Sequence, residues 1–276
     1  MIVELAPAKI NLALHVRHRR ADGYHALETL FAFLTDGDTV SVAPAAQARF
    51  TVTGPFADGL SGEGDNLVTR AAALVTAHYA LPAALEIVLD KRLPIASGIG
   101  GGSADAAATI RALARLHGIA ADQPALFKIA EELGADVPAC LLGRSAFGSG
   151  KGEQLAAVEG LGGTPVLLVN PGVAISTGAV FAAWDGIDRG PLPDGALIER
   201  ALAGRNDLEA PARAMAPVIG EVVAMLAGQT GVMLARMSGS GATCFALFER
   251  LADRAAAAAT IRHARPGWWL LESTLA

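Results

Sequence analysis

Apolar residues occupy every second position from Ile10 to Val16, and polar or small residues stand between them. A repeat of two is typical of a β-strand with one buried face. Because alternate side chains of a strand share a face, the repeat predicts that Lys9, Asn11 and His15 point to the same side. We therefore expect a half-buried strand that carries a polar site.

The rest of the chain mixes strand and helix periodicities without a strict βαβ repeat. Strands are expected at residues 39–42, 49–53, 85–89, 165–169, 231–236, 243–248 and 268–272. Helices are expected at residues 66–79, 103–117, 176–184, 217–227 and 251–263, with one more between Asp122 and Gly134. Asp65 and Asp122 are the expected N-caps of two of these helices. This mixture predicts an α+β fold rather than a barrel.

A glycine-dense stretch at residues 143–163 separates the two halves of the chain. We place the domain boundary near its end, which predicts domains at residues 1–160 and 161–276. A tight glycine turn is expected at residues 238–241, between two of the strands of the second half.

The composition narrows the function classes. The chain has 276 residues, 52% of them hydrophobic, and 22 Lys and Arg against 27 Asp and Glu, a formal net charge of −5. This apolar content is too high for intrinsic disorder. The acidic balance disfavours nucleic acid as a partner, because clustered basic residues supply that affinity. Cys140 and Cys244 lie far apart, which argues against a disulfide scaffold and provides no metal-ligand spacing.

No apolar run reaches membrane-spanning length, and no basic region precedes an apolar stretch at Met1. We therefore expect a cytoplasmic protein without a membrane partner. The oligomeric state does not follow from the sequence.

The strongest local signal is a glycine-rich segment between an expected strand and an expected helix. Four of the five positions 98–102 are glycine, and Ser103 follows. Glycines let backbone N–H groups converge on an anion, and a helix start adds unsatisfied N–H groups and a positive dipole end. The alternative is a flexible turn with Ser103 as N-cap. We favour a phosphate site because four glycines at a helix start are costly without a close approach.

Two other nucleotide motifs do not fit. The dinucleotide fingerprint requires a third glycine where Ser103 stands. Residues 148–152 resemble a P-loop, but Ser145 occupies the first glycine position and Gly152 the hydroxyl position. We interpret residues 148–152 as a turn.

The chain resembles the GHMP kinase superfamily, which includes galactokinase, homoserine kinase and mevalonate kinase. The resemblance lies in residues 7–12, 19–31, 94–103, 134–138 and 237–242. It implies a two-domain fold, with an N-terminal half similar to ribosomal S5 domain 2 and a ferredoxin-like C-terminal half. It also implies ATP-dependent phosphorylation of a small molecule. One departure is Ser103-Ala104-Asp105, where Ser-Ser-Asn is more usual.

The resemblance implies two catalytic residues. Lys9 would be the cation that stabilises the base, the emerging alkoxide and the moving phosphoryl group. Asp136 would be the general base that takes the proton from the acceptor hydroxyl. The alternatives are a solvated strand face for Lys9 and a helix N-cap before Pro138 for Asp136.

The resemblance also implies the ATP site, with Mg²⁺ on the phosphates and Ser103 as a candidate metal ligand. The expected ATP-binding residues of the loop are Pro94, Gly98, Gly100, Gly101, Gly102, Ser103 and Ala104. Asn66 and Lys91 are placed at the adenosine half, although a helix cap and a strand end explain them equally well.

The resemblance is strongest to those members that phosphorylate the 2-hydroxyl of a cytidine-diphosphate-linked methylerythritol, in the non-mevalonate isoprenoid route. Tyr24, His25 and Phe181 are placed at the cytidine, since flat side chains stack on a base. The other expected acceptor-binding residues are Asn11, Thr177, Ser238, Gly239 and Gly241. Hairpin packing, helix core and a plain strand–strand turn are the alternatives for these residues.

Two other functions stay open. The first is a kinase of the mevalonate or homoserine type, against which the Asp-Gly-Tyr-His stretch at residues 22–25 argues. The second is a catalytically silent nucleotide-binding protein of the same fold, against which the presence of both Lys9 and Asp136 argues.

Overall fold

The computed structural model describes residues 1–60 and 66–276. They form two compact units, and each unit gathers segments that are distant in the sequence. Unit 1 consists of Met1–Ala8, Asp36–Ile95 and Gly100–Gly143, and unit 2 of Lys9–Thr35, Ala96–Ile99 and Arg144–Ala276. Strands β1 (Ile2–Arg19) and β2 (His25–Pro44) pair with each other and contribute residues to both units. The predicted boundary at residue 160 stays a prediction.

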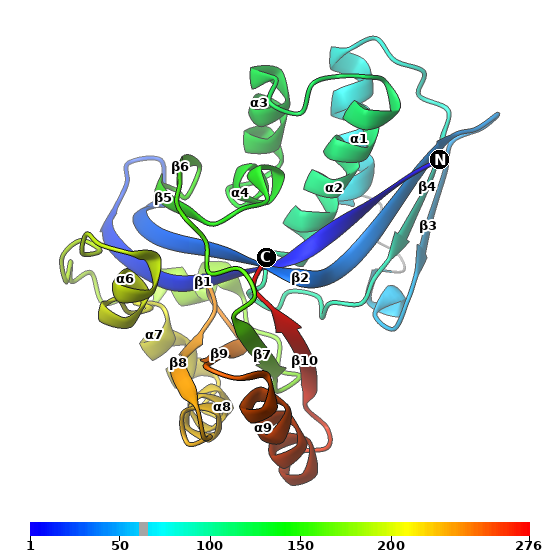
Figure 1. Ribbon diagram of the computed structural model, residues 1–276. Helices are drawn as coiled ribbons and strands as arrows, with labels where there is room; N and C mark the ends of the chain where they lie inside the picture. The colour runs from blue at the N-terminus through cyan, green and yellow to red at the C-terminus, as the bar shows by residue number, and fades with distance from the viewer. Residues whose placement is uncertain (61–65) are drawn as a thin grey trace. The chain divides into compact units, whose positions relative to one another are not determined.

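Unit 1 combines a sheet with a group of helices. The second half of β2 pairs antiparallel with β4 (Leu85–Asp90), which pairs parallel with β3 (Arg49–Thr53). The helices are η1 (Ala57–Leu60), α1 (Leu67–His78), α2 (Gly101–Leu116), α3 (Pro124–Leu133) and α4 (Val137–Leu142). Figure 1 shows α1 and α2 close together, and α4 also packs on α2. Six of the ten buried residues of α2 are alanine, whose small side chain permits this close packing.

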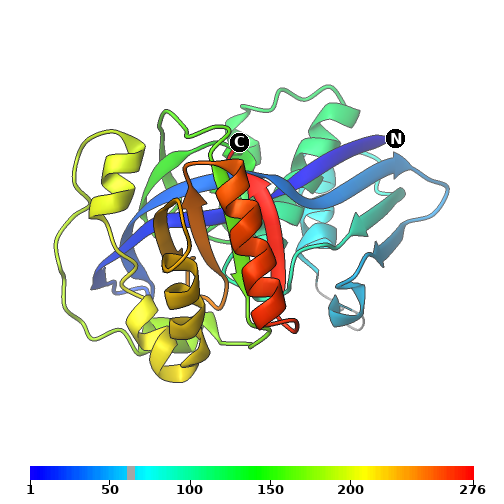
Figure 2. The same ribbon diagram turned by 60° about the horizontal axis from the view of Figure 1, so that its bottom comes forward.

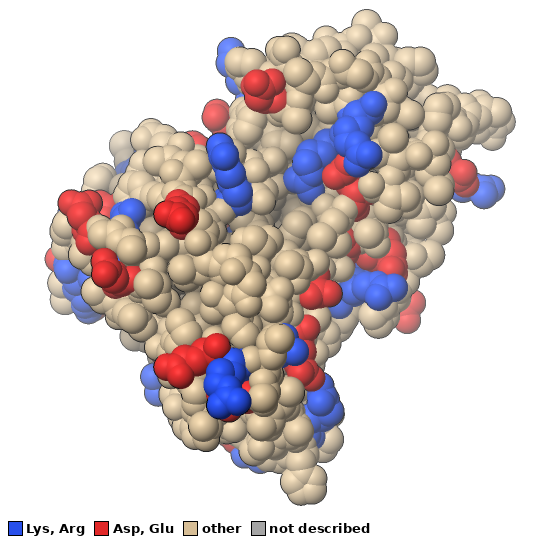
Figure 3. All heavy atoms as spheres, in the orientation of Figure 1, with Lys and Arg blue, Asp and Glu red and all other residues tan. Residues whose placement is uncertain are grey.

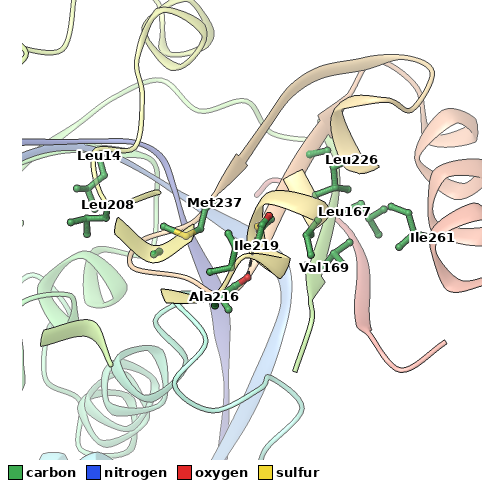
Figure 4. Close-up of a cluster of buried hydrophobic side chains, with 14 of the residues drawn as sticks. Leu14, Leu167, Val169, Leu208, Ala216, Ile219, Leu226, Met237 and Ile261 are labelled. Carbon is green, nitrogen blue, oxygen red and sulfur yellow. Dashed lines mark hydrogen bonds between the residues drawn. The ribbon is translucent and has the colours of Figure 1, made fainter. Parts of the chain in front are cut away.

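Unit 2 contains a four-stranded antiparallel sheet in the order β10-β7-β9-β8. Its strands are β7 (Pro165–Asn170), β8 (Val232–Met237), β9 (Cys244–Phe248) and β10 (Trp269–Thr274). Figures 1 and 2 show α8 (Val218–Ala227) and α9 (Leu251–Ala264) against one face of this sheet. The side chains between them belong to the buried cluster of Figure 4, which also includes Leu14 of β1 and Leu208. Every residue of the central strands β7 and β9 is buried.

The remainder of unit 2 lies around the first half of β2. That half pairs with β5 (Ala146–Gly150), which forms a hairpin with β6 (Gln154–Ala157). Three short helices follow in the chain, namely α5 (Thr177–Ala182), α6 (Leu197–Ala203) and α7 (Glu209–Met215).

The predicted α+β class is confirmed, but two strand predictions need correction. Strand β1 was expected to have one buried face, yet all residues from Ala8 to Val16 are buried. Strand β2 was expected at residues 39–42 only and runs from His25 to Pro44. Its middle is apolar at almost every position and buried on both faces, so no alternation reveals it.

The helix ends also differ from the predictions. Asn66 caps α1, since its side-chain oxygen accepts from the N–H of Val68 at 2.8 Å, while Asp65 lies outside the described residues. Helix α3 begins at Pro124 without a side-chain cap, so the prediction of Asp122 as N-cap is wrong. Helices α6 and α7 and the hairpin of β5 and β6 were not expected.

Candidate active site

The glycine-rich segment ends in the first turn of α2, within unit 1. Gly100 precedes the helix in the left-handed conformation (φ 65°), and no side chain caps the helix. The first helical hydrogen bond runs from the N–H of Ala104 to the carbonyl of Gly100, at 2.8 Å. The N–H groups of Gly101, Gly102 and Ser103 therefore have no carbonyl partner within the helix. Ser103 is the third residue of the helix, so its alternative role as N-cap is wrong.

The backbone before the helix alternates in handedness. Ala96, Gly98 and Gly100 have φ values of 50°, 79° and 65°, and the residues between them do not have positive φ. Alternation of this kind turns successive N–H groups toward a common point and favours a bound anion. The local backbone of this segment thus suits a phosphate group.

Gly98 is also required for contact with the glycine turn at residues 238–241. A Cβ at Gly98 would lie 2.6 Å from the carbonyl oxygen of Ser238 and 2.7 Å from that of Gly241. A Cβ at Gly239 would lie 2.9 Å from the carbonyl oxygen of Gly98. The Ser238 hydroxyl donates to the Gly98 carbonyl at 3.0 Å. These two expected substrate-binding segments therefore meet through their backbones.

Lys9 and Asn11 extend this arrangement into β1. Lys9 is only 2% exposed, so the alternative of a solvated strand face is excluded. Its Nζ donates to Asn11 Oδ1 at 3.1 Å, and the Asn11 amide donates to Thr29 Oγ1 at 2.8 Å. The Asn11 backbone N–H donates to the Ser238 hydroxyl at 3.1 Å. Thr29 was not among the expected site residues, because its place opposite Asn11 depends on the pairing of two strands.

His15 makes its hydrogen bonds to Gly190 and Arg205, and not to the group that contains Lys9 and Asn11. The N–H of Arg205 donates to Nε2 at 3.1 Å, so the ring is neutral and Nδ1–H donates to the carbonyl of Gly190 at 3.1 Å. Burial, with a smaller contribution from Arg205, lowers the pKa of His15. The shared strand face was therefore a poor guide to shared function for this residue.

Asp136 lies immediately before α4 in unit 1. Its side chain makes no capping hydrogen bond, so the alternative role as a side-chain cap is excluded. Helix α4 is held to α2 by Arg111, whose Nη1 donates to the carbonyl of Cys140 at 2.8 Å. Asp136 and the first turn of α2 are thus carried by two helices packed against each other.

An aromatic cluster forms in unit 2 from two of the predicted residues and one that was missed. His25 stacks on Phe181 with ring centroids 5.1 Å apart, and Trp184 meets His25 edge-on at 5.7 Å. Burial, followed by Arg19, lowers the pKa of His25. Trp184 lies two residues beyond the end of α5, where its backbone N–H donates to the carbonyl of Phe181 at 3.2 Å. Tyr24 is exposed, and its ring lies 4.8 Å from Nζ of Lys151.

The remaining predicted residues have the following places. Thr177 begins α5, and its hydroxyl lies 2.9 Å from that of Ser240 in the glycine turn. Asn66 is the N-cap of α1. Lys91 is buried in unit 1 and pairs with Asp38 and Asp105. Burial alone would lower the pKa of Lys91, but Asp105 and Asp38 outweigh it and raise that pKa.

The described part of the surface carries both charge signs. On the face shown in Figure 3, Lys and Arg side chains lie in small groups among Asp and Glu side chains. Among the described residues, no helix is long and apolar enough to cross a membrane.

Comparison with known proteins identifies the class. Residues 66–144 match the N-terminal domain of GHMP kinases, and residues 191–265 match their C-terminal domain. Homoserine kinase from Cytophaga hutchinsonii has the same fold, with a TM-score of 0.73 at 18% identity over 99% of this chain and 94% of that chain. The chain belongs to the GHMP kinases, which are ATP-dependent small-molecule kinases, as predicted.

Relatives with much higher identity share one name. A protein from Rhizorhabdus wittichii is 59% identical over 99% of this chain and 94% of the relative, and one from Sphingopyxis alaskensis is 54% identical over 97% and 96%. Both are named 4-diphosphocytidyl-2-C-methyl-D-erythritol kinase. A crystal structure of 4-(cytidine 5'-diphospho)-2C-methyl-D-erythritol kinase matches with a TM-score of 0.81 at 38% identity, over 99% of each chain.

Proposed function

We propose that this protein transfers the γ-phosphoryl group of ATP to the 2-hydroxyl of 4-diphosphocytidyl-2-C-methyl-D-erythritol, in the synthesis of isoprenoid precursors by the non-mevalonate route. The observation that carries the proposal is the near-complete match to the relative from Rhizorhabdus wittichii that bears this kinase name, at 59% identity. The cytoplasmic location remains part of this proposal.

The first turn of α2 would hold the phosphates of ATP. The N–H groups of Gly101, Gly102 and Ser103 point out of the helix start, where the dipole favours an anion. Pro94, Gly98, Gly100 and Ala104 are the other residues of the glycine-rich segment that we expect to contribute to ATP binding. Asn66, which caps α1 in the same unit, would lie at the adenosine.

Mg²⁺ would bind mainly through the phosphates of ATP. Among residues 1–60 and 66–276, no group of three or more His, Cys, Asp or Glu side chains is placed to hold a metal ion. Mg²⁺ does not require such a group, because it keeps several waters and takes one or two protein oxygens beside substrate phosphates. The Ser103 hydroxyl would be one such oxygen. When bound, Mg²⁺ would neutralise part of the phosphate charge.

Asp136 and Lys9 would have different roles at the acceptor hydroxyl, one in proton transfer and the other in charge stabilisation. Asp136 takes the hydroxyl proton as general base, and the Lys9 ammonium stabilises the oxygen that attacks phosphorus. Lys9 suits this role because it is buried and oriented by Asn11. Phosphoryl transfer requires little more of a protein than such positioning and charge stabilisation.

The aromatic cluster would recognise the cytosine base. The His25 and Phe181 centroids are 5.1 Å apart, whereas a base between them requires about 7 Å, two stacking distances. The base therefore stacks on an outer face of this pair or separates its rings, and Tyr24 supplies a second aromatic face. Asn11, Thr177, Ser238, Gly239 and Gly241 would line the rest of the acceptor site.

Replacing the base tests the proposal. Asp136→Asn should leave ATP binding nearly intact and lower kcat by about three orders of magnitude, because the amide cannot take the proton. ADP release with the cytidine-linked acceptor measures turnover, and calorimetry measures ATP binding. Asp122→Asn, at an exposed aspartate of the same unit, is the matched control. Near-normal turnover of Asp136→Asn would contradict the assignment.

The alternative acceptors have weaker support. The matches to homoserine and mevalonate kinases have 12–18% identity and show the fold alone. ADP release should follow addition of the cytidine-linked acceptor and not of mevalonate or homoserine. ATP binding without ADP release for any of the three acceptors would indicate a catalytically silent nucleotide-binding protein.

A further inference from the structure

Three charged side chains are buried together in unit 1. Lys91, Asp38 and Asp105 have side-chain exposures of 3%, 0% and 4%. Nζ of Lys91 lies 2.6 Å from Asp38 Oδ2 and 2.6 Å from Asp105 Oδ2. One ammonium thus joins two carboxylates in a region closed to water. We call these three residues the Lys91 cluster.

The Lys91 cluster joins three segments of the chain. Asp38 belongs to β2, Lys91 follows the last residue of β4, and Asp105 lies in the second turn of α2. Asp38 Oδ1 also accepts from the backbone N–H groups of Arg92 at 2.5 Å and Leu93 at 2.8 Å. The beginning of the glycine-rich segment is thereby held to the sheet, with the lysine between the sheet and the helix.

The first turn of α2 lies close to the Lys91 ammonium. Gly101 and Asp105 are four residues apart and so lie on one face of the helix. A Cβ at Gly101 would lie 3.0 Å from Nζ of Lys91 and 3.8 Å from Asp38 Oδ2. The backbone of Gly101 therefore approaches the ammonium closely because this residue has no side chain.

The arrangement leaves little of Lys91 for a direct contact with nucleotide. Two of its three N–H bonds have carboxylate acceptors, and its exposure of 2% separates it from solvent. Oδ1 of Asp105 is also buried, and it has no hydrogen-bond partner among the described atoms. The Lys91 ammonium is therefore directed at the two carboxylates and not at solvent.

We propose that Lys91, Asp38 and Asp105 are positioning residues, which set the first turn of α2 so that its N–H groups meet the phosphates of ATP. The inference rests on the proposed role of this turn as the phosphate site. Lys91 then acts through the helix, in place of touching the adenosine.

The decisive variant is Asp38→Asn, because it takes charge from the cluster while leaving Lys91 in place. If Lys91 positions the helix, Asp38→Asn and Lys91→Met should both raise the Kd for ATP by about tenfold, with KM for the acceptor unchanged. If Lys91 touches the nucleotide, Asp38→Asn leaves the Kd unchanged or lowers it, since the ammonium is released. That second outcome overturns the inference.

Two further variants separate positioning from loss of folding. Asp105→Asn removes the charge of the other carboxylate and keeps an oxygen for Lys91, so it should raise the Kd for ATP in the same direction as Asp38→Asn. The increase should be smaller, because only Asp38 also accepts the backbone N–H groups of Arg92 and Leu93. Glu86→Gln, at an exposed position of β4, is the matched control and should change nothing. A fall in melting temperature with no change in Kd for any cluster variant would show a purely structural role and overturn the inference.

The same measurements keep this inference apart from the proposed function. A wild-type protein that binds no ATP contradicts the proposed function. A wild-type protein that binds ATP and phosphorylates the acceptor, while all cluster variants keep its Kd, contradicts the positioning role alone.

Discussion

Two segments of this protein have nearly the same glycine-rich composition and very different structures. Residues 98–103 lead into α2, where three N–H groups have no partner within the helix. Residues 148–152 end β5 and turn toward β6. There the carboxylate of Glu153 already accepts from the N–H of Lys151 at 2.5 Å. An anion is favoured at the first segment and repelled at the second, so the helix start matters more than the glycines.

Within the first segment, two glycines are required for different reasons. Gly98 has a left-handed backbone and touches the backbone of the turn at residues 238–241. Gly101 lies in the first turn of α2 without positive φ, and a Cβ there would lie 3.0 Å from the Lys91 ammonium. One glycine therefore serves a contact between loops, and the other the approach of a helix to a buried charge.

The largest effect is expected at Gly98. Gly98→Ala should lower the free energy of unfolding by about 3 kcal/mol or more, because its Cβ would lie 2.6 Å from a backbone oxygen that cannot yield. Urea denaturation measures the change. Gly118→Ala is the control, since Gly118 also has positive φ but has nothing within 4 Å of a Cβ, and it should lose only about 1 kcal/mol. Equal losses would show that the contact between loop and turn is loose.

The next effect is expected at Gly101. Gly101→Val should weaken ATP binding by about tenfold or more, because its side chain displaces the Lys91 ammonium or the helix start. Calorimetry with ATP measures the change. A Cβ at the neighbouring Gly102 would make only an ordinary contact of 3.5 Å with Leu67, so Gly102→Ala should have a smaller effect. If Gly101→Val binds ATP with unchanged affinity, this glycine has only a structural role in the turn.

Replacing Tyr24 and His25 tests whether the aromatic side chains beside the second segment serve the acceptor. Lys151 lies 4.8 Å from the ring of Tyr24, and the neighbouring His25 stacks on Phe181. Replacing Tyr24 and His25 together with Ala should raise KM for the acceptor by about tenfold and leave KM for ATP nearly unchanged, because stacking on the base is lost. Steady-state kinetics with each substrate varied in turn measures both constants. Equal increases in the two constants would remove the cytidine role.

The smallest effect is expected from the turn itself. Glu153→Gln should leave the Kd for ATP within about twofold of the wild type and lower stability by about 1 kcal/mol, since the amide accepts the N–H of Lys151 more weakly than the carboxylate does. Calorimetry and urea denaturation measure the two quantities. A change in ATP affinity much larger than twofold, in either direction, would mean that the second glycine-rich segment also takes part in phosphate binding, and the comparison would fail.

Elements with a local signal were predicted well. The expected helices at residues 66–79, 217–227 and 251–263 correspond to α1, α8 and α9, because an amphipathic repeat and a helix end are written in neighbouring residues. The turn at residues 238–241 was found for the same reason. Strand β2 was largely missed, because a strand buried on both faces has no alternation to detect.

The candidate site also combines features that local sequence predicts with features that depend on distant segments. The glycine-rich helix start and the family follow from short stretches of sequence, because each residue type there has a local backbone reason. The stack of His25 on Phe181 and the join of Asp38, Lys91 and Asp105 follow from chain segments that are far apart. The roles of Lys9 and Asp136 stay predictions.

Short stretches of sequence were enough to predict the kinase class, the glycine-rich helix start and most regular elements, since periodicity and backbone freedom act between near neighbours. Only the tertiary structure decided that β1 is buried on both faces, that Lys91 is enclosed by two carboxylates and that Gly98 touches a turn some 140 residues away. Such contacts depend on how distant segments pack and exclude water, and the residues on either side of each position do not determine that packing.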